Sequence, residues 1–201
     1  MEYEGLSQDD LANVTALNRA WLQLNRDSQR RLPGQRLERL AATPFLLFSF
    51  REQDDAWWSW LLGDRRQQDI LARQPVVTGE LRQLQAAGLG FLWELARRNA
   101  YVARIVSGAP LTWCEQIGTT TFVRLLDCAR FETIEPRFAR GTAMHRCLLR
   151  QGGASERNTR DFAQIAALQS VLTSGQAEQY GRLPAAACRM QRSARQVADK
   201  L

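Results

Sequence analysis

Hydrophobic residues recur along most of this chain at spacings of three and four, which is the period of one face of an α-helix. The first stripe follows Ser7, which together with Asp10 has the pattern of a capping box. Its apolar members are Leu11, Val14, Leu17, Trp21 and Leu24. A shorter helix is predicted over residues 35–42, and Thr43-Pro44 ends it because the residue before a proline avoids helical geometry.

The middle of the chain carries four more helix patterns. They span residues 54–63, 65–74, 78–106 and 111–130. Thr78 is a favourable cap for the longest of them, whose apolar stripe continues without interruption to Val106. In the last of the four, the residues expected to face inward are Trp113, Ile117, Phe122, Leu125 and Leu126.

Beyond residue 131 the pattern is less regular, and turn residues are frequent. Three further helices are predicted, between Gly141 and Gln151, from Asn158 onward, and over residues 185–199. The first carries Cys147, and in the second the residues expected to face inward are Phe162, Ile165, Ala166, Leu168 and Leu172.

Residues 45–50, Phe-Leu-Leu-Phe-Ser-Phe, are the one segment that has the composition of a buried strand. No second run of this kind could pair with it, so we expect a buried connector or helix turn, with at most one short strand pair. Helices joined by short connections predict an all-α, irregular multi-helix bundle. We expect a helical core domain over residues 1–151 and a basic helical segment over 152–201 that packs on it, with Gly152-Gly153 at the boundary.

The composition is that of a globular protein, with 45% hydrophobic and 24% charged residues. No apolar run is long enough to span a membrane, and the acidic start of the chain does not resemble a signal peptide. We therefore expect a cytoplasmic protein without membrane contact.

Charge is distributed unevenly along the chain. Residues 1–136 hold 16 basic and 17 acidic side chains, whereas residues 137–201 hold 11 basic and 4 acidic ones. This asymmetry indicates an anionic partner, either nucleic acid or an acidic protein, although a solvated arginine-rich surface has the same pattern. The candidate contacts are Arg137, Arg140, Arg146, Arg150, Arg157, Arg160, Arg189 and Arg192.

Motifs of catalysis and of metal binding are missing from the sequence. It has no P-loop, dinucleotide-binding, zinc-protease or nucleophile-elbow pattern, and its single histidine, His145, has no carboxylate close in sequence. The cysteines are widely spaced, at Cys114, Cys128, Cys147 and Cys188. Some of them could form a zinc site with His145, but structural zinc sites contain closer ligand pairs, so we expect no enzyme, no metal and no cofactor.

Trp57, Trp58 and Trp60 form an unusual cluster in one predicted helix. Adjacent helical residues point about 100° apart, so the three indoles cannot all enter one core. Tryptophan is enriched in binding hot spots, and we expect a partner interface here, with closure of a core edge as the alternative. Asn18 and Asn99 lie in or beside the apolar stripes, where an asparagine either binds backbone groups or marks the edge of the stripe.

Two stretches within residues 13–51 resemble a known family. They are Leu17-Asn-Arg-Ala-Trp-Leu-Gln-Leu24 and Leu37-Glu-Arg-Leu-Ala-Ala-Thr-Pro-Phe-Leu-Leu-Phe-Ser-Phe-Arg51. A leucine-rich helix opening with an asparagine, followed by a short helix and an aromatic segment, resembles the FlhD family of flagellar transcriptional regulators. A similar pattern at residues 99–106 and 122–126 would make an internal duplication. The resemblance implies a helical, dimeric protein that works in transcription.

The sequence therefore predicts a non-enzymatic helical regulator that acts in bacterial transcription control through protein or nucleic-acid binding. The alternative is a protein-binding adaptor or chaperone-like factor that does not contact nucleic acid. Either function is compatible with a homodimer.

Overall fold

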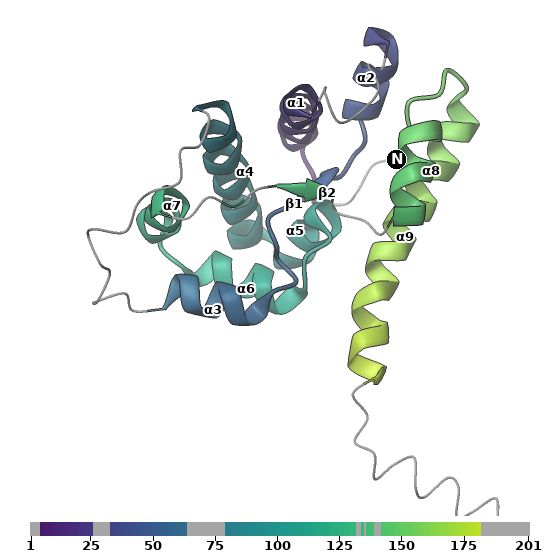
Figure 1. The fold of residues 1–201 in the computed structure, drawn as a ribbon. Helices are drawn as coiled ribbons and strands as arrows, with labels where there is room; N and C mark the ends of the chain where they lie inside the picture. Colours follow the sequence, from purple (N-terminus) through teal and green to yellow (C-terminus); the bar gives the residue numbers. More distant parts are fainter. Residues whose placement is uncertain are drawn as a thin grey trace, which may run out of the picture.

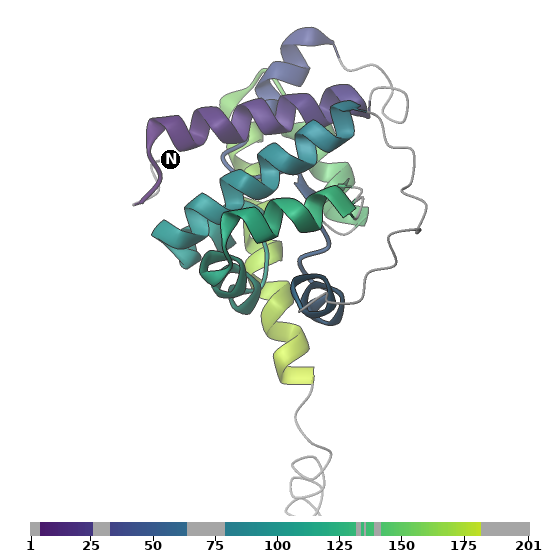
Figure 2. The ribbon, with the colours of Figure 1, turned by 90° about the vertical axis from the view of Figure 1, so that its left-hand side faces the viewer.

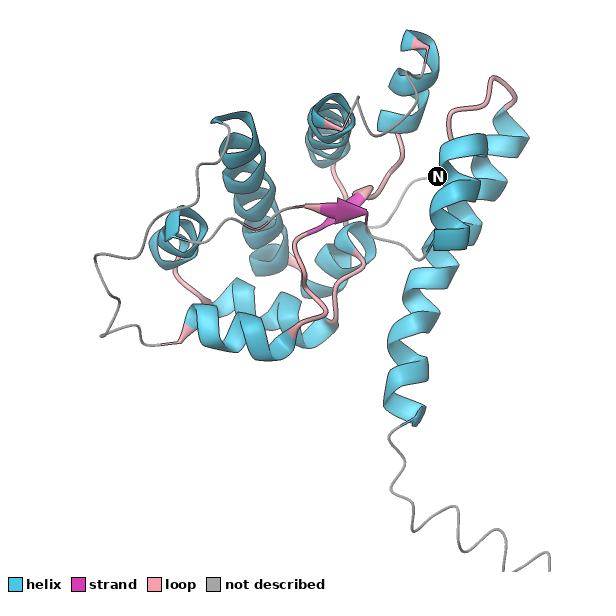
Figure 3. Ribbon diagram, viewed as in Figure 1, coloured by secondary structure: helices cyan, strands magenta, loops and turns pink. Residues whose placement is uncertain are grey.

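The computed structural model describes residues 5–25, 33–63, 79–131, 134, 136–138 and 142–181. Within them it contains nine helices and two strands of two residues each, which confirms the predicted all-α class (Figure 3). The elements are α1 (Gln8–Leu24), α2 (Gly34–Ala41), β1 (Phe48–Ser49), α3 (Asp55–Leu62), α4 (Gly79–Arg98), α5 (Ala100–Ser107), α6 (Leu111–Thr119), α7 (Phe122–Phe131), β2 (Arg137–Phe138), α8 (Thr142–Gln151) and α9 (Arg157–Gly181).

The predicted helix starts at Ser7 and Asp54 are confirmed by their hydrogen bonds. The Ser7 hydroxyl accepts from the Asp10 N–H at 3.1 Å, and the Asp10 carboxylate accepts from the Ser7 N–H at 2.9 Å. The Asp54 carboxylate accepts from the Trp57 N–H at 3.1 Å. Both caps bind N–H groups that have no partner within the helix, so they fix the first residues of α1 and α3.

Two of the predicted long helices are each divided in the structure, so their continuity was predicted wrongly. Asn99 separates α4 from α5, because its extended backbone (φ −159°, ψ 106°) lets its side chain accept from the N–H groups of Tyr101 and Val102. Thr120, also extended, ends α6. Asparagine and threonine favour capping over helix interiors, and this local preference outweighs the unbroken apolar stripe. The predicted helices over 65–74 and 185–199 lie outside the described residues.

Helix α4 lies at the centre of the bundle, where it packs against α1, α5, α6 and α7 (Figures 1 and 2). Gly88 of α4 faces the aromatic ring of Phe50, and a Cβ at this position would lie 2.7 Å from Phe50 Cζ. The absence of a side chain at Gly88 therefore lets the aromatic segment pack directly on the central helix.

The aromatic segment crosses the core as an extended connector. Its side chains are buried except for Ser49, which is partly exposed. No second extended run was expected, yet Phe48 and Ser49 pair antiparallel with Phe138 and Arg137. Among the described residues this is one short strand pair, the most that the sequence predicted. The pairing escapes sequence reading because the partner strand is only two residues long and has no apolar run around it.

Asn18 holds this connector from α1. Its fully buried side chain donates from Nδ2 to the carbonyl oxygens of Ala41, Thr43 and Phe45, at 3.2, 3.3 and 2.9 Å. Its Oδ1 accepts from the Leu47 N–H at 2.9 Å. Of the two roles expected for Asn18, the structure therefore shows backbone binding.

Helices α8 and α9 form a hairpin at one side of the bundle, with α2 as the neighbouring element at its turn (Figure 1). Gly152 and Gly153 lie in this turn and are buried. The predicted boundary at Gly152-Gly153 falls in the turn between α8 and α9, and these two helices pack against each other. Residues 182–201 of the predicted C-terminal segment lie outside the described residues.

The inward face of α9 differs from the prediction. Leu168 is buried as predicted, and Ala163 and Ala167 are buried too, whereas Phe162 is 71% exposed and Ile165 is also exposed. Small alanines allow α9 to approach its neighbours closely, so the helix is rotated from the orientation that its larger apolar residues predicted.

Candidate partner-binding surfaces

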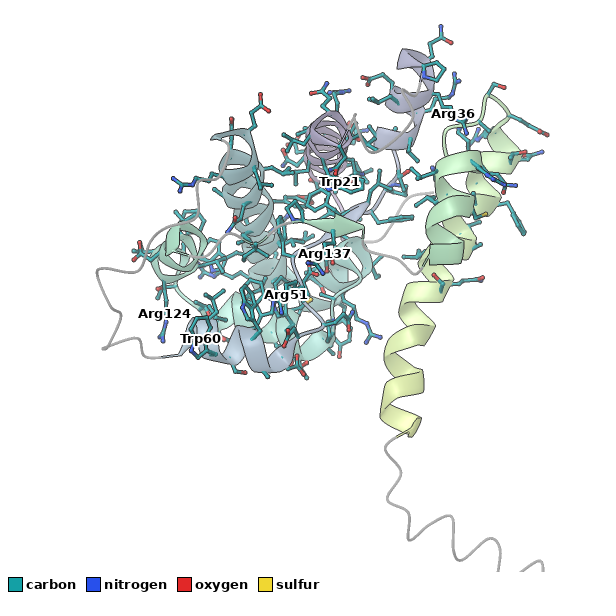
Figure 4. All side chains as sticks on the ribbon, in the orientation of Figure 1. Trp21, Arg36, Arg51, Trp60, Arg124 and Arg137 are labelled. Atoms are coloured by element: carbon teal, nitrogen blue, oxygen red, sulfur yellow. The ribbon has the colours of Figure 1, made fainter. Side chains whose placement is uncertain are left out.

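Arginines from distant parts of the chain meet at the turn of the α8–α9 hairpin. We call the surface formed by Arg36, Arg39, Arg150, Arg157 and Arg160 the hairpin surface. Arg36 Nη2 donates to the carbonyl oxygens of Leu149 and Arg150 at 3.0 and 2.6 Å, and Arg39 Nε donates to that of Gly153 at 3.1 Å. Figure 4 shows Arg36 where α2 faces α8.

The position of Arg36 has a clear physical cause. The last carbonyl groups of α8 have no partner within the helix and lie at the negative end of its dipole, so a guanidinium is favourable there. Gly153 allows the close approach, since a Cβ at this residue would lie 2.7 Å from the Arg36 carbonyl oxygen. Arg36 and Arg39 therefore attach the hairpin to α2.

The positive charge at this surface is largely unmatched by carboxylates. Arg160 Nη1 donates to the carbonyl oxygens of Ala154 and Ser155, at 2.9 and 2.8 Å. Within the described residues, the one carboxylate paired with these five arginines is Asp161, which lies 3.5 Å from Arg157. Glu156, directly before α9, adds a second carboxylate at this turn, and it accepts from the Thr159 hydroxyl at 2.9 Å. The arrangement thus leaves a positive field that an external anion can neutralise.

The predicted arginines divide into those the structure places and those it does not. Arg150 and Arg157 are exposed and Arg160 is half-buried, all at the hairpin surface. Arg137 is exposed, but Figure 4 shows it at the strand pair, away from Arg36. The side chains outside the described residues are those of Arg140, Arg146, Arg189 and Arg192.

Sequence reasoning missed Arg36 and Arg39 as members of this surface. Their spacing of three places them on one face of α2, which is a signal the sequence does contain. What it does not contain is the contact between α2 and the hairpin, more than 100 positions away in sequence.

The three tryptophans of α3 have different environments. Trp58 is fully buried, donates its indole N–H to the Arg51 carbonyl oxygen at 3.1 Å, and packs edge-on against Trp113. The structure therefore places Trp58 in the core, where no partner can reach it, because the helix turns this side chain inward. Trp57 is half-buried beneath the Arg51 guanidinium, which lies 4.9 Å from its ring centroid.

Trp60 is 57% exposed, as expected for at least one member of the cluster. Figure 4 shows it near Arg124 of α7, whose Nη2 donates to the Leu62 carbonyl oxygen at the end of α3. Next to Arg124 in sequence, Val123 is 68% exposed and Phe122 is also exposed. The Phe122 ring packs on Trp93 of α4, with 4.9 Å between the ring centroids. We therefore call Trp60 and Arg124, at the facing ends of α3 and α7, the α3–α7 face.

Two surface grooves also lie beside α1. One, of about 610 Å³, runs between α1 and α4 and is lined by the alanines and leucines of both helices. The other, of about 440 Å³, lies between α1 and α9 and includes Pro44, Arg157 and Ile165. The second groove adjoins the hairpin surface through Arg157.

The described residues contain no group of three or more histidine, cysteine or acidic side chains able to hold a metal ion. Burial raises the pKa of the Cys114 thiol to about 12, and the nearby charge of Glu52 adds to this effect. A thiol of this kind is protonated at neutral pH and is a poor nucleophile. Cys147 donates weakly to the Gln151 side chain at 3.4 Å, whereas the side chains of Cys128, His145 and Cys188 lie outside the described residues.

In the part of the chain that the structure describes, no helix is long and apolar enough to cross a membrane. The resemblance of residues 13–51 to the FlhD family stays a prediction. Asn18, the asparagine of that pattern, binds the backbone of Phe45 and Leu47 in the aromatic segment. Comparison with protein-family models, with curated proteins and with solved structures gives no match.

Proposed function

We propose that this protein is a non-enzymatic helical regulator that acts in transcription control by binding nucleic acid through the hairpin surface. One observation supports the proposal above all: arginines from α2, α8 and α9 gather around one turn with a single paired carboxylate among them. Arginine is the side chain best suited to phosphate, because its guanidinium offers several donors in one plane.

The nucleic-acid form of the proposal makes a quantitative prediction about salt. Each arginine–phosphate contact releases condensed counterions, so the logarithm of the binding constant falls by about 0.9 per contact for each tenfold rise in salt on duplex DNA. Arg150→Gln combined with Arg157→Gln removes two exposed guanidinium groups and leaves Arg36 and Arg39, which attach the hairpin, in place.

Fluorescence anisotropy with labelled duplex DNA of mixed sequence measures this slope. The double variant should show a slope lower by about 2, whereas Arg82→Gln, an exposed arginine of α4, should leave it unchanged. Equal slopes in the double variant, the control and the wild type would refute the role of the hairpin surface. Absence of wild-type binding to DNA and to RNA would refute the nucleic-acid form and direct the test to acidic proteins.

A second candidate function is that of a protein-binding adaptor acting through the α3–α7 face. Its specific support is the exposure of Trp60 near Arg124, since tryptophan and arginine are both enriched in binding hot spots. Trp60→Ala should abolish capture of a partner from lysate, whereas Tyr101→Ala, which removes an aromatic ring that is 65% exposed on α5, should not. Equal capture by both variants would exclude this face.

A further inference from the structure

Glu52 is a carboxylic acid in the core of the protein. It lies in the turn between β1 and α3, its exposed fraction is 1%, and among the described residues its Oε1 has no hydrogen-bond partner. Burial disfavours the charged form of a carboxyl group, and hydrogen bonds offset this cost only in part when one of the two oxygens has no donor.

The one basic residue of the turn is directed away from this carboxyl group. Arg51 Nη2 lies 2.6 Å from the Asp54 carboxylate, and its guanidinium covers the Trp57 ring. Arg51 also has a positive φ of 61°, which is strained for a residue with a side chain. The turn is therefore held in an uncommon backbone conformation while its cation pairs with Asp54 on the surface.

Among the described residues, no cation compensates for the charge of Glu52. Besides burial, the charges of Glu52 and of Glu115 on α6 raise the pKa of the Cys114 thiol, and that of Arg104 on α5 lowers it. Trp113 Nε1, beside Cys114 in the chain, is buried without a hydrogen-bond partner among the described residues. Glu52 thus lies near the Cys114 thiol, on which Arg104 also acts.

The titration of Glu52 follows from this environment. Burial raises its pKa from 4.5 to about 7, against hydrogen bonds from the N–H groups of Phe50 and Glu52 and from the Ser49 hydroxyl. A carboxyl group whose pKa is raised by folding contributes its full stability to the folded protein below pH 4.5. This contribution is lost as the pH rises through 7.

We propose that Glu52 is a proton-controlled latch, which in its protonated form holds the 51–54 turn and α3 against α5 and α6, and which loosens them when it ionises. Three contacts define the part that would loosen. Asp54 N–H donates to the Arg51 carbonyl oxygen at 2.9 Å, Trp58 Nε1 donates to the same oxygen, and Gln53 Nε2 donates to the Gly108 carbonyl oxygen at 3.2 Å. Because α3 carries Trp57 and Trp60, the latch makes the α3–α7 face responsive to pH in the neutral range.

The size of the effect follows from the two pKa values. The opening constant is the ratio of the loosened to the closed form of the 51–54 turn and α3. A pKa shift from 4.5 to about 7 makes this constant larger, on the order of a hundredfold, when Glu52 is ionised than when it is protonated. Hydrogen exchange of the intact protein, read by mass spectrometry and corrected for the intrinsic pH dependence of exchange, measures that constant locally. Protection of residues 50–62 should fall roughly thirtyfold between pH 5.5 and 8.5, while that of α1 stays constant.

Glu52→Gln, a neutral isostere of the protonated side chain, should remove this fall in protection. Glu115→Gln, which neutralises an exposed glutamate on α6, should retain it. Constant protection in the wild type, or an equal fall in Glu52→Gln, would overturn the latch. Should Glu52→Gln fail to fold, the wild type decides alone, because an equal loss of protection in α1 and in residues 50–62 would show that no local latch exists.

Discussion

Replacing Asn18 with alanine tests whether one buried side chain fixes the path of the central connector. The change leaves the Leu47 N–H and the Phe45 carbonyl oxygen without their 2.9 Å partners, and it also removes the longer bonds to Ala41 and Thr43. Each buried polar group left without a partner costs about 1–3 kcal/mol. Counting the two short bonds in full predicts a loss of roughly 4 kcal/mol, a large part of the 5–15 kcal/mol typical of a folded domain.

Urea denaturation followed by circular dichroism measures this loss. With an m-value of about 2 kcal/mol/M, the midpoint of Asn18→Ala should fall by about 2 M. Asn13→Ala is the matched control, because Asn13 is an exposed asparagine of the same helix, and it should change the midpoint little. A fall in Asn18→Ala no larger than in Asn13→Ala would refute the assignment of these hydrogen bonds.

Asn18→Asp separates hydrogen bonding from packing, since its volume is nearly that of the native side chain. It places a carboxyl oxygen where Nδ2 now faces three carbonyl oxygens. Their repulsion raises the pKa of the new carboxyl group, so the variant should be destabilised at pH 8 and should regain stability as the pH falls. A pH-independent loss would contradict this account.

Three further changes have defined outcomes. Gly88→Ala places a Cβ 2.7 Å from the buried Phe50 ring, so overpacking of about 1–3 kcal/mol should outweigh the helix propensity gained and lower the Tm in a calorimetric scan. Glu52→Gln should raise the free energy of unfolding relative to wild type by about 3 kcal/mol at pH 8.5 and by much less at pH 5, because wild-type stability falls between pH 4.5 and 7, where the unfolded state ionises and the native side chain keeps its proton. Gly153→Ala should detach the hairpin from α2 through contact with the Arg36 backbone, and unchanged proteolysis of the hairpin turn would contradict this.

The helical class and most helix starts could be predicted because their signals are local. Ser7 and Asp54 cap helices within three residues of themselves, so the pattern and the structure agree. The divisions at Asn99 and Thr120 were missed because an apolar stripe continues through both, and periodicity alone does not weigh capping preference against it. The rotation of α9 was missed for a related reason, since alanines give a weak hydrophobic signal yet allow the closest packing.

The candidate surfaces could be predicted only in part. Arg150 and Arg157 belong to a charge run, and Trp60 to a cluster that cannot be wholly buried, so both features are visible in the sequence. Arg36 joins them through a contact that spans more than 100 positions, which no local pattern contains. Glu52 gives no sequence signal at all, because an isolated glutamate in a turn is ordinarily exposed.

We call residues 42–54, which include the aromatic segment, the strap. It is one extended connection across the core, with the contacts of Asn18 near its start and Glu52 near its end. At one end of the strap Asn18 binds the backbone with an uncharged amide, which does not titrate and therefore holds the strap at every pH at which the protein folds. At the other end Glu52 lies in a strained turn next to α3, where its charge state depends on pH in the neutral range. A rise in pH should therefore loosen the strap from the α3 end, while the α1 end and the hairpin surface attached through α2 keep their contacts. The two candidate surfaces would then respond differently to pH, with partner binding at the α3–α7 face changing between about pH 5 and 7 through Glu52.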